Sequence, residues 1–173
     1  AKEINVPLLV GEGSTDAAAH GYAEIFNEST FALYEINLYT RICTICQPLS
    51  ILQWQLTSDY SLLWGGGIYG SKGPLRPTQR FWNIKQLAST PADALAIPVS
   101  SSKKNVNCAA FGNMVRGEYA VHMVNNGADC EAVISGIPAE VKKLKVYVTN
   151  TKDCMKETAV KVELSLIHIS EPT

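Results

Sequence analysis

The sequence VPLLVGEGSTD, residues 6–16, decides how the fold is read. An apolar run ends at Gly11, a single carboxylate stands at Glu12, and Gly13 follows before a polar cluster. The apolar run over residues 4–10 predicts a strand buried on both faces, as found in parallel sheets. Glu12 therefore stands just past the carboxyl end of a predicted core strand.

The next segments alternate between helical and strand patterns. Residues 29–46 predict a helix that ends before Pro48, because proline cannot continue a helix. Its apolar side chains recur at helical spacing and predict the buried stripe: Phe31, Tyr34, Leu38, Ile42 and Ile45. Residues 49–56 predict a second buried strand, a glycine-rich loop follows, and residues 77–90 predict another helix. This order is typical of a parallel α/β fold.

The pattern changes after Pro91 to short runs with period-two alternation. Val121 and Met123 share one face of such a run, and glycine-containing turns separate the runs. Strands at this spacing predict an antiparallel β-sandwich over residues 91–163, following an α/β domain over residues 1–90.

The last ten residues, LSLIHISEPT, are not expected to belong to either domain. Residues 164–173 look like the translation of a transposase adapter used in preparing sequencing libraries. We therefore give His168 and Glu171 no functional role and expect this tail to be poorly packed.

Composition excludes several function classes. The 173 residues carry a net charge of −1, which gives no electrostatic reason to expect nucleic acid or an anionic membrane as a partner. No apolar run reaches the roughly 18 residues that a membrane span needs. Five cysteines include the C-x-x-C pair Cys43 and Cys46, but no second ligand pair accompanies them. We expect packing cysteines, with a metal or redox site as the alternative, and we predict no metal and no cofactor.

Glu12 has the position of a reactive residue in a parallel barrel, where chemistry occurs just past the carboxyl ends of strands. A carboxylate there can attack an anomeric carbon or transfer a proton, and the flanking glycines would leave room for a ligand. The structural alternative is a helix cap or an ion pair. The segment lacks the lysine of a phosphate loop and the serine of a hydrolase elbow.

The second predicted strand ends in LQWQL, with Trp54 between Gln53 and Gln55. Buried amides need hydrogen-bond partners, so a polar mouth lined by substrate would explain the glutamines. The indole offers a flat apolar face on which a sugar ring can pack. The alternative is that Trp54 packs under a helix.

Taken in order, these segments resemble the end of a clan A retaining glycoside hydrolase, and they are most similar to glycoside hydrolase family 30. The resemblance covers residues 4–163. Strand seven of that family ends in the nucleophile glutamate, matching Glu12 in LLVGEGS, and strand eight carries a tryptophan matching Trp54-Gln55-Leu56. The last barrel helix and the sandwich strands match RPTQRFWNIKQLAST, GEYAVHMVNNG and EAVISGIP.

The resemblance implies the last two βα units of a (β/α)8 TIM barrel followed by a β-sandwich. It implies that a secreted or periplasmic bacterial parent enzyme cleaves a polysaccharide or glycoconjugate by double displacement, with Glu12 as nucleophile. The family's acid/base glutamate follows strand four, which is not in this sequence, so we expect the chain alone to be inactive. Substrate contacts are expected from the second strand and the loop after it: Gln53, Trp54, Gln55, Tyr60, Trp64 and Tyr69.

Other interpretations stay open. Asn27-Glu28 looks like the family's acid/base pair, but it follows Glu12 by only 16 residues, so we assign Glu28 to the surface or to helix capping. We expect His20 to be structural. The rival functions are a non-catalytic carbohydrate-binding or interaction protein and an α/β enzyme that binds phosphate at its strand ends. Open strand edges would make an incomplete barrel prone to aggregation.

Overall fold

The computed structural model describes residues 5–15, 21–58, 60–139, 141, 143–158, 161–163 and 166–169. The first part of the chain contains β1 (Leu9–Gly13), η1 (Ala23–Asn27), α1 (Ser29–Cys46), β2 (Ser50–Gln53), β3 (Leu63–Trp64), η2 (Ile68–Gly70), β4 (Arg76–Pro77) and α2 (Gln79–Leu87). The second part contains only strands: β5 (Leu95–Ile97), β6 (Val106–Asn113), β7 (Glu118–Asn125), β8 (Ala132–Ile134), β9 (Val146–Val148), β10 (Lys156–Thr158), β11 (Lys161–Glu163) and β12 (Leu166–Ile169).

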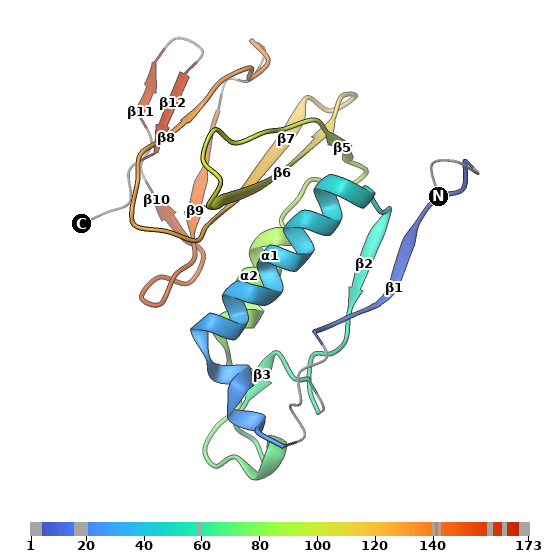
Figure 1. Ribbon diagram of the computed structural model, residues 1–173, viewed down its shortest axis with the longest axis vertical. Coiled ribbons are helices and arrows are strands. Elements are labelled where there is room, and N and C mark those ends of the chain that lie inside the picture. Colours follow the sequence, from blue (N-terminus) through green and yellow to red (C-terminus); the bar gives the residue numbers. More distant parts are fainter. Residues whose placement is uncertain are drawn as a thin grey trace.

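The strands β1 and β2 lie side by side and run in the same direction, with α1 as the connection between them (Figure 1). Val10 pairs with Ile51, and Gly13 pairs with Gln53, so β1 advances three residues while β2 advances two. The extra residue of β1 falls at Gly11 or Glu12 and forms an irregularity beside the carboxyl end of the strand.

The predicted order of strand, helix, strand, loop and helix is confirmed, but the predicted strand bounds are wrong. β1 spans Leu9–Gly13 and not residues 4–10, so Glu12 lies within the paired part of the strand and not past its end. β2 ends at Gln53 and not at residue 56.

The prediction that both strands are buried on two faces is wrong. Leu9 is 57% exposed and Leu52 is 53% exposed, while Ile51 and Gln53 on the alternate positions of β2 are half-buried. In the described part of the chain this sheet has two strands, and a single layer of helices lies on one side of it (Figure 1). The other face of the sheet is therefore open, although the two strands have the apolar composition of core strands.

Helix α1 has the predicted bounds, but of the predicted buried stripe only Phe31 is buried. Tyr34 is 62% exposed and Ile45 is 63% exposed. The buried positions are Phe31, Ala32, Glu35, Tyr39, Thr40 and Cys43. Four of these recur every four residues, so the inward face is regular, but it includes a glutamate that a hydropathy pattern assigns to solvent.

A buried ion pair holds α1 against α2. Arg80 is completely buried and Glu35 is 1% exposed. The guanidinium donates from Nε to Glu35 Oε2 at 2.9 Å and from Nη2 to Oε1 at 2.6 Å, which is the two-point geometry that suits arginine and a carboxylate. Phe26 and Phe31 cover it, with ring centroids 4.8 Å and 5.3 Å from Cζ. This polar contact occupies the centre of the helix layer.

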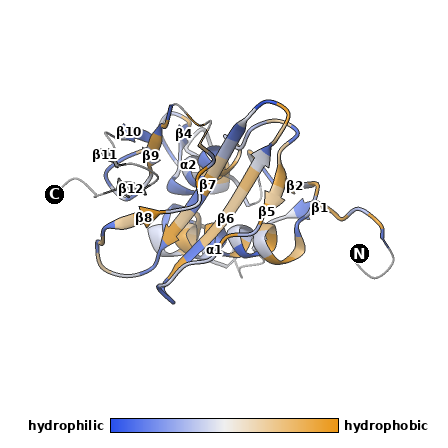
Figure 2. Cartoon of the chain, turned by 90° about the horizontal axis from the view of Figure 1, so that it is seen from above, coloured by the Kyte–Doolittle hydropathy of each residue, from blue (hydrophilic) through white to orange (hydrophobic). Residues whose placement is uncertain are grey.

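The second part of the chain forms small antiparallel sheets. β5, β6 and β7 make a three-stranded sheet, β8, β12 and β11 make another, and β9 pairs with β10. Figure 2 shows hydrophobic residues along β6, which lies beside β7. Residues 166–169 of the expected non-native tail lie in β12 and pair with β8, and the remaining tail residues lie outside the described part. The division at residues 90–91 and the closure of these sheets into one sandwich stay predictions.

Polar side chains join α1 to the β6–β7 hairpin. Thr44 Oγ1 donates to the carbonyl of Cys108 at 2.6 Å. Asn37 donates to Asn126 Oδ1 at 2.6 Å and accepts from Asn107 at 2.5 Å. These bonds fix the helix on the hairpin and keep the predicted turn after β7 in contact with α1.

The cysteines only partly follow the packing prediction. Cys43 is buried, but Cys46 and Cys154 are exposed, and all five thiols are free. Burial raises the pKa of Cys43 and of Cys108, which keeps these two protonated at neutral pH. Among the described residues no group of three or more His, Cys, Asp and Glu side chains could hold a metal ion. No helix in the described part is long and apolar enough to cross a membrane.

His122 makes the stability of the fold depend on pH. Its Nε2 lies 2.8 Å from Thr90 Oγ1, and burial lowers the pKa of the imidazole to about 4. Between pH 6.5 and 4 the unfolded chain therefore binds a proton that the folded chain does not, and stability falls as pH falls. We expect His122 to account for about 3 kcal/mol of this loss. Urea unfolding at several pH values gives the free energy of unfolding as a function of pH. Between pH 6.5 and 4 this free energy should fall less steeply in His122→Gln than in the parent, and equal slopes would contradict this role.

Candidate functional site

Glu12 and Trp54 come from the carboxyl ends of two adjacent parallel strands. Glu12 is exposed in β1, and Trp54 follows β2 directly, with 44% of its side chain exposed. The Trp54 amide donates to the Gly13 carbonyl at 2.7 Å, which ties the end of β2 to the residue beside Glu12. The Trp54–Gln55 peptide bond is cis. The structure thus brings the two strand ends together at one edge of the sheet.

The two glycines beside Glu12 have different surroundings. A Cβ at Gly13 would lie 2.8 Å from Ile51 Cγ2 and 3.0 Å from Tyr39 Oη, whereas a Cβ at Gly11 would meet nothing within 4 Å. Gly13 is therefore explained by the packing of Tyr39 and Ile51 behind the strand, so the sequence-based interpretation that it leaves room for a ligand is not needed. Only Gly11 faces open space.

Alanine substitutions test this difference. We expect Gly13→Ala to lower the free energy of unfolding by about 1–3 kcal/mol, because Ile51 and the strand must move apart. The matched variant Gly11→Ala should change it by less than about 0.5 kcal/mol. Chemical denaturation of both variants measures the difference. Equal losses in the two variants would show that the packing behind Gly13 is not tight.

Gln53 is held by the protein itself. Tyr39 donates from its hydroxyl to Gln53 Oε1 at 2.5 Å, and Gln53 Nε2 donates to the Trp54 carbonyl at 2.9 Å. Burial raises the pKa of Tyr39, so its hydroxyl stays a donor. The amide therefore has partners on both sides without a substrate and orients the peptide of Trp54. Substrate contacts from Gln53 and Gln55 stay predictions.

The three aromatic residues predicted on the long loop form a cluster with Phe26. Tyr69 stacks on the Phe26 ring at 5.6 Å, Tyr60 meets its edge at 5.8 Å, and Trp64 lies 6.2 Å from Tyr69. The Tyr60 amide donates to Tyr69 Oη at 2.7 Å. Their rings thus serve loop packing, and a second role as sugar contacts stays a prediction.

Polar groups with unmet hydrogen-bonding capacity follow Glu12. Among the residues that the structure describes, Ser14 Oγ and Thr15 Oγ1 have no hydrogen-bond partner, although both are buried and buried hydroxyls usually have one. Within the described part of the chain no side chain donates a hydrogen bond to the Glu12 carboxylate.

Glu28 and its neighbours occupy a different place. Glu28 is the N-cap residue of α1 and makes no capping bond through its side chain. Thr30 Oγ1 lies 3.5 Å from its carboxylate. Glu28 thus lies at the start of α1, but its side chain does not cap the helix, and its assignment to the surface or to helix capping stays a prediction. His20 lies outside the described residues.

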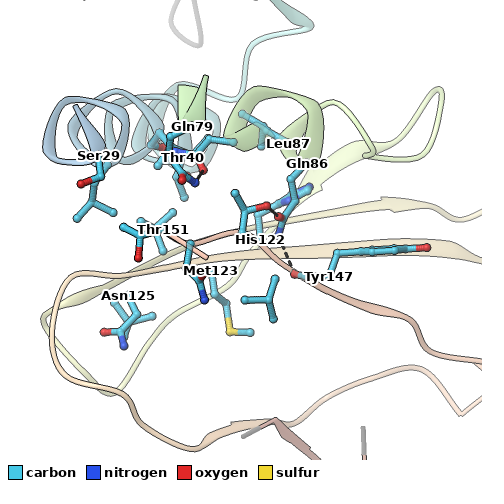
Figure 3. A pocket seen from close by; sticks show the side chains of 18 of the residues that line it. Ser29, Thr40, Gln79, Gln86, Leu87, His122, Met123, Asn125, Tyr147 and Thr151 are labelled. Carbon is cyan, nitrogen blue, oxygen red and sulfur yellow. Dashed lines mark hydrogen bonds between the residues drawn. The ribbon is translucent and has the colours of Figure 1, made fainter. Parts of the chain in front are cut away.

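A cavity of about 430 Å³ lies where α1 and α2 meet the strands β7 and β9 (Figure 3). None of the predicted site residues lines it. Its polar groups are mostly paired within the protein: Gln86 donates to the Tyr147 carbonyl at 2.8 Å and accepts from Thr149, and His122 bonds Thr90. The cavity follows the junction between the helices and the strands, so it does not compete with the strand ends as a candidate active site.

Sequence reasoning missed Glu35 and Arg80. The available signal was the recurrence of Phe31, Glu35, Tyr39 and Cys43 at every fourth position, which places the glutamate on the inward face. A buried carboxylate needs a cationic partner, and an arginine on the following helix can supply one.

Comparison with known proteins gives a fold but no sequence family. No family model and no curated protein matches the sequence. The structure is similar to the crystal structure of a glycoside hydrolase family 30 subfamily 8 xylanase from Clostridium acetobutylicum, with a TM-score of 0.77 at 11% sequence identity. The similarity covers 99% of this chain and 41% of the xylanase chain. The chain thus has a fold similar to part of a glycoside hydrolase and spans less than half of that enzyme's length.

Proposed function

We propose that this chain is the C-terminal part of an exported retaining β-glycoside hydrolase in which Glu12 is the nucleophile. In this proposal residues 1–90 supply the last two βα units of a (β/α)8 barrel, and residues 91–163 supply a β-sandwich. The observation that carries the proposal is the joining of Glu12 and Trp54 at the carboxyl ends of two parallel, hydrogen-bonded strands. That edge is where parallel barrels place their reactive groups.

The open faces of the first part support an incomplete barrel. Five apolar side chains in or beside β1 and β2 are exposed: Val6, Leu9, Leu49, Leu52 and Leu56. On α1, Tyr34 and Ile45 are exposed as well. Further βα units would cover both the strands and the outer side of α1. The coverage of 41% of the xylanase chain agrees with this view. On its own, the chain should expose these surfaces and aggregate.

The proposed reaction proceeds in two displacements at the anomeric carbon. The Glu12 carboxylate attacks C1, the bond from C1 to the glycosidic oxygen breaks, and an acid upstream of this chain protonates the leaving oxygen. The same upstream group, now a carboxylate, takes a proton from water, and the water oxygen attacks C1 and releases Glu12. The two carboxyl groups would lie about 5 Å apart, as retaining enzymes require. The product keeps the configuration of the substrate.

The exposed indole supports a carbohydrate substrate. The Trp54 ring is 44% exposed and belongs to the strand end that is bonded to the residue after Glu12, and the axial C–H groups of a β-linked sugar can pack on such a flat apolar surface. Because the structural neighbour is a xylanase, a β-linked xylan is the first substrate to assay.

The test uses the enzyme that contains this chain together with the sequence upstream of it. We expect hydrolysis of aryl β-glycosides, and NMR of the first product should show the β-anomer before mutarotation. The α-anomer as first product would contradict a nucleophilic Glu12. Binding of xylan without hydrolysis would favour the rival function of a carbohydrate-binding protein.

The isolated chain provides the matched control. Because the acid/base group is absent from it, we expect no release of aglycone above the uncatalysed rate. Turnover by the 173-residue chain that disappears in Glu12→Gln would contradict the assignment of the acid/base to an upstream strand.

A further inference from the structure

The Arg80 guanidinium makes more hydrogen bonds than its ion pair needs. Nε and Nη2 bind Glu35, but Nη1 donates to the carbonyls of Tyr60 at 3.1 Å and Ser61 at 2.8 Å. Arg80 and Ser61 are both completely buried. The two carbonyls belong to the segment that follows Trp54. One buried cation thus joins α1, α2 and this segment.

The segment is also closed on itself behind Trp54. Leu62 donates its amide to the Gln55 carbonyl at 3.1 Å. The Ser61 hydroxyl lies 2.6 Å from the Leu63 carbonyl and 3.0 Å from the Leu56 carbonyl, and its single proton can be donated to one of them at a time. We call residues 54–58 and 60–62 the clamped loop. Arg80 binds the far end of this loop, and the Leu62 amide binds Gln55 at the near end, so a shift of Arg80 reaches the Trp54–Gln55 peptide.

The near end of the clamped loop is fixed to the strand that carries Glu12. Trp54 donates its amide to the Gly13 carbonyl at 2.7 Å. The backbone of Trp54 therefore lies between two anchors, β1 on one side and the loop held by the buried guanidinium on the other. A fixed backbone restricts the directions that the indole can take.

A buried guanidinium needs acceptors for all of its N–H groups, whatever its role. In Arg80 the acceptors for Nη1 are two successive backbone carbonyls of one loop, so the same cation that pairs with Glu35 also holds this loop. Hydrogen bonds from a charged donor are stronger than neutral ones, so they restrain the loop more than a neutral side chain would.

We propose that Arg80 is a positioning residue that holds the Trp54 indole in place for a sugar ring beside Glu12. The proposal rests on the proposed function, because it takes Trp54 as the sugar platform. Arg80 itself is buried and contacts no substrate. It acts through the carbonyls of Tyr60 and Ser61 and through the hydrogen bond from the Leu62 amide to Gln55.

The test compares three variants of the chain, kept dilute enough to stay monomeric because its exposed apolar faces favour aggregation. The background changes Trp64 and Trp82 to phenylalanine, so that Trp54 is the fluorophore. Arg80→Lys keeps the charge but loses the planar fork that reaches Glu35 and both carbonyls. Glu35→Gln weakens the ion pair and leaves both carbonyl bonds. Arg116→Lys is the surface control, because Arg116 is 55% exposed and lies 3.9 Å from its partner Asp93.

Hydrogen exchange separates positioning from stability. In Arg80→Lys the Leu62 amide should exchange about tenfold faster relative to the amides of α1, as expected for lost charged hydrogen bonds. Acrylamide should also quench Trp54 more strongly. In Glu35→Gln and Arg116→Lys the ratio of Leu62 to α1 exchange should stay within about twofold of the parent. An unchanged ratio in Arg80→Lys, or an equal change in Glu35→Gln, would overturn the proposal.

The unmodified chain gives a second measurement in case Arg80→Lys does not fold. If Arg80 holds the clamped loop, the loop opens only when the core unfolds. The exchange rate of the Leu62 amide should then rise with urea, at concentrations below the unfolding transition, as steeply as the rates of the α1 amides. Exchange of Leu62 independent of urea would overturn the proposal. Neither readout uses a sugar, so a failure here is distinct from a failure of Glu12 as nucleophile.

Discussion

Replacing Glu12 by glutamine should lower kcat/KM of the longer enzyme on aryl β-glycosides by about 10⁴-fold to 10⁶-fold, the range found when a nucleophile is removed. The amide has nearly the size of the carboxylate but cannot form the covalent intermediate. Because Glu12 is exposed, the same change should alter the free energy of unfolding by less than about 0.5 kcal/mol. Steady-state kinetics and denaturation on one preparation measure both quantities.

Glu28→Gln is the matched control for this loss. Glu28 forms part of the Asn27-Glu28 pair that looks like a catalytic motif, but it lies at the N-cap of α1. Its substitution should leave kcat/KM within about threefold of the parent, as for a residue that contacts no substrate. A large loss in Glu28→Gln together with activity in Glu12→Gln would contradict the assignment of roles.

Removing the Arg80 guanidinium should produce the largest loss of stability. Arg80→Met leaves the Glu35 carboxylate buried without its cation, which should cost about 3–5 kcal/mol. The double variant Glu35→Leu, Arg80→Met should recover part of this loss, because no unpaired charge stays in the core. Urea unfolding of the parent, Arg80→Met, Glu35→Leu and the double variant forms a double-mutant cycle. The cycle gives the interaction free energy between the two side chains.

A surface pair provides the comparison for that cycle. Arg116→Met removes a cation that is 55% exposed beside Asp93, so the loss should be below about 1 kcal/mol. If Arg80→Met and Arg116→Met lowered the free energy of unfolding by the same amount, the buried ion pair would contribute no more than the exposed one.

The order of elements could be predicted from local patterns. The apolar runs over residues 4–10 and 49–56 predicted the two strands, although β1 is shifted to Leu9–Gly13 and β2 ends at Gln53. The pattern before Pro48 predicted α1. The parallel pairing of the two strands followed from the helix between them, because a crossover connection is needed to bring two strands into the same direction. These features depend on short stretches of sequence and need no knowledge of distant contacts.

The packing within the helix layer could not be predicted in the same way. Tyr34 and Ile45 were expected inside and are exposed, while Glu35 is buried. The reason is that Glu35 becomes an acceptable core residue only when Arg80, 45 positions later, supplies two hydrogen bonds. A helical pattern contains no information about such a distant partner.

The candidate site shows the same division. The sequence placed Glu12 and Trp54 at strand ends, and the structure joins those ends through the Trp54 amide and the Gly13 carbonyl. The role of Gly13 was misread, because its close contacts with Ile51 and Tyr39 come from two other elements. Local sequence thus located the residues, whereas tertiary contacts decided what surrounds each of them.

The most direct measurement is the position of a covalent label from a 2-deoxy-2-fluoro xyloside with a good leaving group, applied to the longer enzyme. Such a compound forms a glycosyl ester with the nucleophile, and the ester is hydrolysed slowly. We expect mass spectrometry of the digested protein to find one fluorosugar on Glu12. A label on any other carboxylate, with Glu12 unmodified, would contradict the central claim.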